Sequence, residues 1–272
     1  MSIKTVSVIG LGYIGLPAAA MFASRKVKVI GVDVNQHAVD TINQGKIHIV
    51  EPGLEELVQE AVRDGWLKAT TIPEAADAFV IAVPTPFKEG REPDVSYIKS
   101  VAKAIAPVLE KGNVIILEST SPVGTTEEMI GWLAAARPDL KFPVEGQDEH
   151  DIHVAYCPER VLPGQVIREL VENDRIIGGI TDSCSEKAIE VYRIFVEGGL
   201  PTTNARTAEM AKLTEEETIP LKEKLSELIK ENLDQFLDLK AHTSLPIEII
   251  PVPRDIDPSI LVWKGGSVYS RL

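Results

Sequence analysis

Short apolar runs alternate with stretches of helical periodicity along most of the chain. The expected strands are short and rich in Val and Ile, and they cover 6–9, 27–32, 79–83, 114–117, 152–156 and 175–180. The expected helices carry apolar residues three or four positions apart, and they cover 14–24, 36–43, the stretch after Pro52, 95–109, 126–136 and 185–196. This alternation predicts βαβ units and therefore an α/β fold with a large, doubly wound parallel sheet of the Rossmann type.

The pattern changes after residue 204. Residues 205–240 form a long, charged helical pattern in which Leu221, Leu225, Leu228 and Ile229 recur at helical spacing. Residues 241–272 are richer in proline and glycine and are expected to be mostly extended. We therefore expect a domain over 1–204, a connecting helix of the dimerisation type over 205–240, and a short α+β tail over 241–272.

Composition excludes several classes of protein. The 272 residues are 44% hydrophobic and 25% charged, which is ordinary for a soluble globular chain. A formal charge of -13 argues against a broad basic surface for nucleic acid or anionic lipid. Two cysteines without a CxxC pair or a metal-type Cys/His spacing predict no metal site and favour a reducing compartment. With neither a signal peptide nor a long apolar run in the sequence, we expect a cytoplasmic protein without membrane segments.

A glycine-rich turn follows the first expected strand and opens an Ala-rich helix. The string Gly10-Leu11-Gly12-Tyr13-Ile14-Gly15 has the GxGxxG spacing of dinucleotide-binding proteins. The first glycine permits a tight turn, the second lets the backbone approach a pyrophosphate, and the third allows close packing of helix on strand. The helix N-terminus offers free N–H groups to the phosphates. The turn therefore predicts a dinucleotide site.

Asp33 ends the second expected strand, 18 residues after Gly15. A carboxylate at this place accepts hydrogen bonds from both adenosine ribose hydroxyls and repels a 2′-phosphate, so it favours NAD over NADP. The alternative is an ordinary glycine turn followed by an unrelated strand-end aspartate. Strand, turn, helix and Asp33 together favour the NAD site.

Five further strings occur in a fixed order along the chain. They are Val8–Pro17 (VIGLGYIGLP), Glu51–Leu54 (EPGL), Val83–Pro86 (VPTP), Glu118–Thr126 (ESTSPVGTT) and Tyr156–Gly164 (YCPERVLPG). Over about residues 1–215 this set resembles the UDP-glucose/UDP-mannosamine dehydrogenase family. Within that family, residues 33–40, 47–50 and 157–165 are similar to the branch that acts on UDP-N-acetyl-D-mannosamine.

The resemblance implies an activity and a set of binding residues. It implies NAD-dependent oxidation of the C6 alcohol of a UDP-sugar, UDP-N-acetyl-D-mannosamine, to a carboxylate through two hydride transfers, for bacterial surface polysaccharide synthesis, by a homodimer. The residues expected to bind NAD are Gly10, Gly12, Tyr13, Ile14, Gly15, Asp33, Pro84, Thr85 and Thr120.

The same resemblance implies three catalytic residues. Thr120 would hold the catalytic water or the end of the cofactor, although a loop hydroxyl that caps the next helix is an alternative. Glu159 would act in proton transfer or thioester hydrolysis, and the alternative is a structural carboxylate paired with Arg160 or another cation. Lys212 matches the family lysine that stabilises the oxyanion.

Two departures from the family pattern lead to a second hypothesis. The family has an asparagine one helical turn after the lysine, but this chain has Glu216, which cannot donate the amide hydrogen bond. Nothing matches the later motif that carries the family's nucleophilic cysteine, and Cys157 is expected to be a small buried thiol. The alternative is therefore a truncated or chimeric NAD-binding module without turnover. A Rossmann dehydrogenase for hydroxy-acid substrates is disfavoured by the ESTSPVGTT and YCPER strings.

The tail has a resemblance of its own. Residues 251–258 and 261–268 resemble the C-terminal part of actin-related proteins, which have a W-x-G-G-S turn. Because the chain lacks the phosphate loops of that fold, we do not expect ATP binding.

Overall fold

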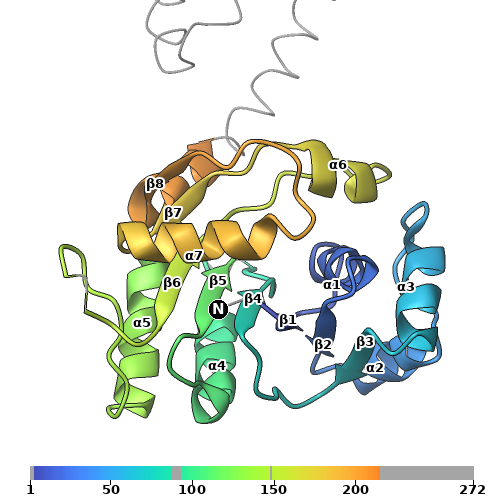
Figure 1. Ribbon diagram of the computed structural model, residues 1–272, viewed down its shortest axis with the longest axis horizontal. Helices are drawn as coiled ribbons and strands as arrows, with labels where there is room; N and C mark the ends of the chain where they lie inside the picture. Colours follow the sequence, from blue (N-terminus) through green and yellow to red (C-terminus); the bar gives the residue numbers. More distant parts are fainter. Residues whose placement is uncertain (1–2, 87, 89–92, 148, 215–272) are drawn as a thin grey trace, which may run out of the picture. The chain divides into compact units, whose positions relative to one another are not determined.

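The computed structural model describes residues 3–214, except 87, 89–92 and 148 (Figure 1). Glu216, most of the expected connecting helix and the tail that resembles actin-related proteins lie outside the described residues.

A single sheet of eight strands forms the centre of the described chain. Its order is β3-β2-β1-β4-β5-β6-β7-β8, which Figure 1 shows from β3 on the right to β8 at the upper left. The strands are β1 (Thr5–Ile9), β2 (Lys28–Val32), β3 (Leu67–Thr70), β4 (Ala78–Ile81), β5 (Val114–Leu117), β6 (His153–Tyr156), β7 (Ile177–Gly179) and β8 (Thr202–Asn204). The predicted α/β fold is confirmed, and β3 and β8 are additional short strands that the apolar pattern did not indicate.

The expectation of a parallel sheet is wrong at one pair of strands. Neighbours from β3 to β6 are parallel, but β7 runs antiparallel to β6, and β8 is then parallel to β7. The only helix between β6 and β7 is α6 (Val166–Glu172), which has seven residues. A parallel crossover must carry the chain back along the whole strand, and here the chain turns back without doing so.

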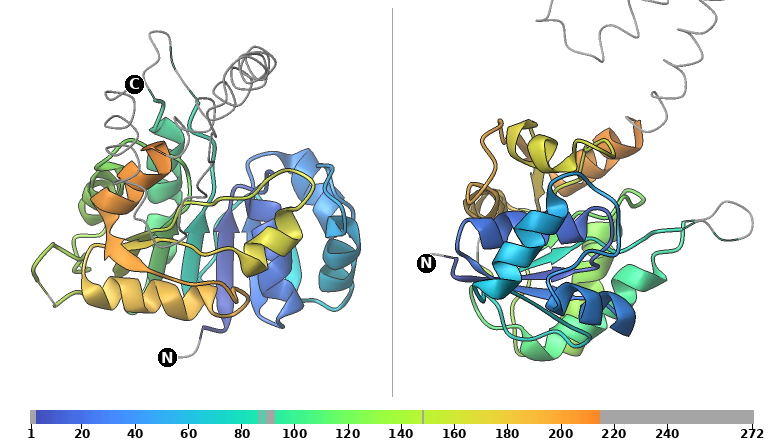
Figure 2. Two further views of the ribbon diagram at one scale, coloured as in Figure 1. Left: turned by 90° about the horizontal axis from the view of Figure 1, so that it is seen from above. Right: turned by 90° about the vertical axis from the view of Figure 1, so that its right-hand side faces the viewer.

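Helices cover both faces of the sheet (Figures 1 and 2). The face that contains Val6 and Val8 packs against α1 (Gly15–Ser24), α3 (Leu54–Arg63), α6 and α7 (Asp182–Tyr192), and α2 (Gln36–Asn43) contributes at its edge. The opposite face packs against α4 (Ser96–Ile105), a 3-10 turn (Ala106–Val108), α5 (Thr125–Ala136) and a last helix over 205–214. Helices on both faces are the reason why β4 and β5 are buried along their whole length.

The start of α7 differs from the sequence prediction because of a cap. The apolar pattern predicts a helix over 185–196, but α7 begins at Asp182 and ends at Tyr192. Thr181 precedes it with an extended backbone, and its hydroxyl accepts a hydrogen bond from the backbone N–H of Cys184. An N-cap threonine satisfies one of the free amides of the first turn and fixes where the helix starts.

Glycine lets the last helix approach the sheet closely. A Cβ atom at Gly178 in β7 would lie 2.6 Å from the Cβ of Ala208 and 2.8 Å from the carbonyl oxygen of Asn204. Both contacts are shorter than van der Waals distance, so only glycine allows this packing. The 205–214 helix therefore lies directly against β7.

Among the described residues, none of the helices has the length and apolar character needed to cross a bilayer.

Candidate cofactor and catalytic site

The candidate residues follow the carboxyl ends of neighbouring parallel strands. Gly10 follows β1, Asp33 follows β2, Pro84 and Thr85 follow β4, and Thr120 follows β5. Because β2 and β4 lie on opposite sides of β1, the connections leave β1 in opposite directions. Such a switch point opens a crevice at the carboxyl edge of the sheet, where doubly wound folds bind their ligands.

The three glycines of the turn have different surroundings. Gly10 has a φ of 91°, and a Cβ there would lie 2.5 Å from the carbonyl oxygen of Ala82. A Cβ at Gly15 would lie 1.7 Å from the carbonyl oxygen of Gly10. Gly12 is exposed, and a Cβ there would meet no atom within 4 Å. The fold thus requires Gly10 and Gly15, whereas Gly12 leaves an open surface that suits a pyrophosphate.

The N-terminus of α1 adjoins this open surface. Ile14 occupies the N-cap position, and no side chain caps the helix there. The amide dipoles of α1 therefore point at the crevice without a competing side-chain acceptor. Tyr13, next in sequence to Gly12, is 52% exposed and borders the same surface.

Asp33 is fixed to the glycine turn by its own carboxylate. One oxygen accepts a hydrogen bond of 2.8 Å from the backbone N–H of Leu11, and the other accepts one of 2.8 Å from Asn35. A carboxylate has about four acceptor positions, so two remain for ribose hydroxyls. The geometry therefore joins the expected ribose ligand to the expected phosphate turn.

The loops after β4 and β5 are also joined. The hydroxyl of Thr85 donates a hydrogen bond to the backbone carbonyl of Thr120, and both side chains are half-buried. Pro84 precedes Thr85 and is exposed. The structure thus brings the VPTP and ESTSPVGTT strings together at the edge where Gly10 ends β1.

Glu159 takes part in a buried ion pair. One carboxylate oxygen lies 2.5 Å from Nη1 of Arg175, and the other accepts a hydrogen bond of 2.7 Å from the backbone N–H of Arg160. The side chains of Glu159 and Arg175 are 5% and 2% exposed. This geometry fits the structural alternative for Glu159, with Arg175 as the cation in place of the Arg160 guanidinium.

A second carboxylate shares Arg175. Nη1 of Arg175 lies 3.7 Å from Oε1 of Glu118, which also accepts a hydrogen bond of 2.6 Å from the Tyr192 hydroxyl. Burial raises the pKa of Glu118 to about 7, partly offset by the attraction of Arg175, and Glu159 adds repulsion. The Arg175 guanidinium also stacks over the Tyr192 ring, 5.0 Å from its centroid. The loops after β5 and β6 are therefore held on one buried arginine.

Cys157 is the small buried thiol that the sequence predicts. It has no exposed surface, and burial raises the pKa of its thiol to about 12. At neutral pH such a thiol is protonated and a poor nucleophile.

Lys212 lies beside the Glu159 loop. Its Nζ donates a hydrogen bond of 2.9 Å to the backbone carbonyl of Glu159, and its side chain is half-buried. The structure thus brings Lys212 and the Glu159 loop together. The helix that carries Lys212 also contributes Glu209, whose fully buried carboxylate accepts hydrogen bonds from Gly124 and Thr126 at the start of α5.

Sequence reasoning missed several residues of this site. They are Glu118, Arg175, Tyr192 and Glu209, all of them buried. Glu118 stands within a string that the sequence singled out, and a carboxylate beside Ser119 and Thr120 was the one available sign of it. The other three partners are distant in sequence and carry no local pattern.

Comparison with known proteins identifies the fold and its relatives. Residues 4–196 match the model of the UDP-glucose/GDP-mannose dehydrogenase family, NAD binding domain. The chain is 69% identical over 211 residues to the UDP-N-acetyl-D-mannosamine dehydrogenase of Campylobacter jejuni, covering 77% of this chain and 52% of that protein. It is 65% identical over 212 residues to the NDP-N-acetyl-D-galactosaminuronic acid dehydrogenase of Ralstonia nicotianae, covering 78% and 50%.

A solved structure supports the same grouping. The UDP-N-acetyl-mannosamine dehydrogenase of Staphylococcus aureus has a TM-score of 0.75 at 40% identity, covering 90% of this chain and 60% of that chain. The chain spans about half the length of the curated relatives it matches.

Proposed function

The chain belongs to the UDP-glucose/GDP-mannose dehydrogenase family, and from this we propose that it is the NAD-binding part of an enzyme that oxidises UDP-N-acetyl-D-mannosamine. The C6 alcohol and one water become a carboxylate, two NAD⁺ each accept a hydride, and three protons are released. The observation that carries this proposal is the set of loops at the carboxyl edge of the sheet, where Asp33 is joined to the glycine turn and Thr85 to the loop of Thr120.

The residues of the crevice fit NAD. The open surface at Gly12 and the uncapped start of α1 suit the pyrophosphate, and Asp33 has acceptor positions left for the adenosine ribose. Pro84 and Thr85 would border the nicotinamide end together with Thr120. NAD supplies the hydride acceptor when bound.

The proposed catalytic roles of Thr120, Lys212 and Glu159 follow from the positions of their side chains. The Thr120 hydroxyl would hold the attacking water or the end of the cofactor, on a loop that Thr85 fixes. Lys212 would stabilise negative charge on the substrate oxygen, since its ammonium group lies at the Glu159 loop. Glu159 would act in proton transfer through the carboxylate oxygen that accepts from the Arg160 backbone N–H, since its other oxygen pairs with Arg175.

The sugar specificity has a second candidate. Two relatives match this chain at 69% and 65% identity, and the name of the second refers to N-acetyl-D-galactosaminuronic acid. N-acetylgalactosamine is a diastereomer of N-acetylmannosamine, with the opposite configuration at C2 (acetamido group) and C4 (hydroxyl group), so it would make different hydrogen bonds in the site. The substrate assay must therefore compare both sugars.

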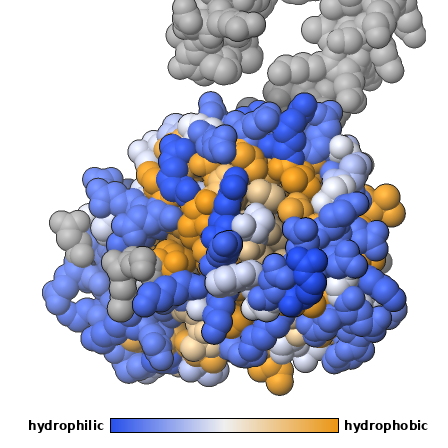
Figure 3. Space-filling view, turned by 45° about the vertical axis from the view of Figure 1, so that its right-hand side comes forward, coloured by the Kyte–Doolittle hydropathy of each residue, from blue (hydrophilic) through white to orange (hydrophobic). Residues whose placement is uncertain are grey.

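The proposal also includes an oligomeric state, a cellular location and domain boundaries. We propose a homodimer, a cytoplasmic location, and a division into a domain over 1–204, a connecting helix over 205–240 and a tail over 241–272. Figure 3 shows apolar side chains gathered in a band on one face with hydrophilic residues around it, and such patches mark interaction surfaces. Light scattering of the purified chain at several concentrations tests the dimer, and a monomer mass throughout would exclude it.

NADH formation tests the activity. The 272-residue chain is mixed with NAD and either UDP-N-acetylmannosamine or UDP-N-acetylgalactosamine, and absorbance of NADH is followed. We expect NADH with the mannosamine nucleotide, less with the galactosamine nucleotide, and none with Lys212→Ala. NAD binding without NADH from either sugar would favour the second function, an NAD-binding module without turnover.

A further inference from the structure

Three side chains that can bind metal gather on the described part of the chain, away from the crevice. They are His150, His153 and Cys184, and their ligand atoms all lie within 4.8 Å of one another. His150 belongs to the loop before β6, His153 is the first residue of β6, and Cys184 lies in the first turn of α7. Sequence spacing does not indicate this cluster, because 34 positions separate His150 from Cys184.

The direction of β7 explains why the three residues meet. Because β6 is parallel to β1, its first residue lies at the amino edge of the sheet, opposite to the glycine turn. Since β7 is antiparallel to β6, the chain leaves β7 at the same amino edge and starts α7 there. The cluster and the cofactor crevice therefore occupy opposite edges.

The sulfur of Cys184 is surrounded by hydrogen-bond donors. It accepts a hydrogen bond of 3.3 Å from the backbone N–H of Val154 and one of 3.2 Å from the Thr181 hydroxyl. Cys184 also lies in the first turn of α7, at the positive end of the helix dipole. The sulfur of Cys184 is therefore held in a fixed position at the start of α7.

The two imidazoles have ring nitrogens that the protein leaves unsatisfied. Nδ1 of His150 and Nδ1 of His153 are buried and have no hydrogen-bond partner among the described residues. Buried polar atoms without partners are rare in proteins, and a metal ion is one group that can fill such a place at Nδ1 of His153. His150 would bind the ion through its other ring nitrogen, Nε2.

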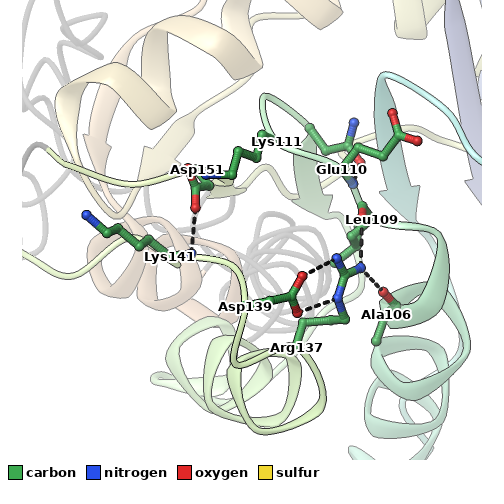
Figure 4. A network of polar contacts seen from close by, with 9 residues as sticks. Ala106, Leu109, Glu110, Lys111, Arg137, Asp139, Lys141 and Asp151 are labelled. Carbon is green, nitrogen blue, oxygen red and sulfur yellow. Dashed lines mark hydrogen bonds and ion pairs between the residues drawn. The ribbon is translucent and has the colours of Figure 1, made fainter.

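The backbone that carries the histidines is held firmly, as Figure 4 shows around Asp151. The Asp151 carboxylate accepts a hydrogen bond of 2.9 Å from the backbone N–H of Lys141 and lies 3.0 Å from Nζ of Lys111. The Asp151 carbonyl accepts a further one of 2.7 Å from Gly112. Because His150 and His153 flank this anchored segment, their rings need only side-chain rotations to adjust.

We propose that His150, His153 and Cys184 bind a divalent transition-metal ion, with zinc the best match, and that water supplies the fourth ligand. One thiolate and two imidazoles form the borderline-soft donor set that zinc prefers. Ligand atoms of a tetrahedral zinc centre are about 3.3–3.6 Å apart, given Zn–N and Zn–S bonds of about 2.0–2.3 Å. Here Sγ of Cys184 and Nε2 of His150 are already 3.9 Å apart. Nε2 of His150 also lies 3.2 Å from the Thr181 hydroxyl and 3.0 Å from the Ser183 hydroxyl, and the ion would replace these two hydrogen bonds. Both histidines are half-buried, so an ion can reach them from solvent.

The ion would connect α7 to β6. A metal that binds the folded chain and not the unfolded chain raises the melting temperature in proportion to the logarithm of its concentration over Kd. The metal site therefore stabilises the part of the sheet where β7 runs antiparallel to β6. It takes no part in hydride transfer.

Cobalt and zinc binding to the complete 272-residue chain test the proposal. Chelator-treated protein is titrated with Co²⁺, and absorption in the near ultraviolet reports thiolate-to-cobalt charge transfer. Zinc is then added to displace the cobalt, and melting temperature is measured with and without zinc. We expect one Co²⁺ per chain with a thiolate band, displacement by zinc, and a higher melting temperature with zinc.

Variants separate this site from surface binding. Cys184→Ser should lose the thiolate band, and His150→Ala or His153→Ala should weaken zinc binding at least tenfold. His37→Ala and His48→Ala are the matched controls, since both histidines are exposed and lie outside the cluster, and they should bind zinc as the wild type does. Absence of the thiolate band in the wild-type chain overturns the proposal whether or not the variants fold, and so does equal zinc binding by folded Cys184→Ser.

Discussion

Glu209 accepts two hydrogen bonds from Thr126, one of 2.9 Å from the backbone N–H and one of 2.7 Å from the hydroxyl. A third, of 2.6 Å, comes from the backbone N–H of Gly124. A carboxylate from the 205–214 helix thus caps the N-terminus of α5, which lies 83 positions earlier in the chain. Because the same helix carries Lys212, the cap also ties that residue to the loop of Thr120.

Removal of this cap should destabilise the fold. Glu209→Ala leaves two amides and one hydroxyl buried without an acceptor, and we expect it to lower the free energy of unfolding by about 2–4 kcal/mol. Glu209→Gln keeps one acceptor oxygen and should cost about half as much. Urea unfolding measures both, with Glu128→Ala as the control because Glu128 is an exposed residue of α5. Equal midpoints for Glu209→Ala and Glu128→Ala would show that the cap contributes nothing.

Glu118 should make stability depend on pH. Burial, as the largest cause, raises the pKa of Glu118 in the folded chain to about 7 from its ordinary value of 4.5. The folded chain therefore holds a proton that the unfolded chain loses. This contribution to stability is complete below about pH 4.5 and is lost as pH rises through about 7, with a magnitude on the order of 1–3 kcal/mol.

The variant Glu118→Gln isolates this effect, since an amide imitates the protonated carboxyl beside Arg175, Tyr192, Glu159 and Cys157. His153 acts in the opposite sense, because burial lowers its pKa to about 4, so its contribution is lost as pH falls. The His153 contribution is the same in the wild type and in Glu118→Gln, so it cancels when one unfolding free energy is subtracted from the other. The unfolding free energy of the wild type minus that of Glu118→Gln should fall from pH 5 to pH 8. A constant difference over this range would contradict the assignment.

Gly12 should be important for NAD affinity and have little effect on folding stability. A Cβ there meets no protein atom within 4 Å, so Gly12→Val should fold, but its isopropyl group occupies the surface where the pyrophosphate approaches. We expect at least a tenfold loss of NAD affinity by calorimetry. Gly131→Ala is the matched control, because a Cβ there also meets nothing and the residue lies within α5. It should leave NAD affinity unchanged and add about 0.5–1 kcal/mol of stability. Unaltered NAD affinity in Gly12→Val would remove the phosphate role of the turn.

Cys157 should be unreactive in the native chain. Its thiol is fully buried with a pKa raised to about 12, and the thiolate is the reactive form. Iodoacetamide at pH 8 should label Cys157 only after unfolding in urea, and peptide mass spectrometry measures the labelled fraction. Rapid labelling of Cys157 in folded protein, at the rate of a free thiol, would reopen its role as a nucleophile.

The sequence predicts those residues of the site that belong to a continuous local motif. The strand, the turn and the helix around Gly10, Gly12 and Gly15 follow each other directly, so spacing alone defines them. Asp33 ends the next strand, and the parallel pairing of β1 with β2 carries it to the turn. The fold class can be predicted for the same reason, because the alternation of strand and helix repeats along the chain.

The rest depends on contacts between distant segments. The apolar character of β7 does not reveal its direction, so the meeting of His150 with Cys184 could not be predicted. The same holds for Arg175, whose partners Glu118 and Glu159 come from two other loops. A charged residue in a sequence is expected at the surface, and only the fold shows that these three are enclosed together.

The close approach at Gly178 couples two positions that are 30 residues apart. A methyl group on β7 would push the 205–214 helix outward through Ala208, and the hydrogen bond from Lys212 to Glu159 would lengthen with it. Loss of the Ala208 methyl group would not make room for it, because a Cβ at 178 would still lie 2.8 Å from the carbonyl oxygen of Asn204 and 2.9 Å from Cα of Ala205. A library that varies positions 178 and 208 together should therefore return only glycine at 178.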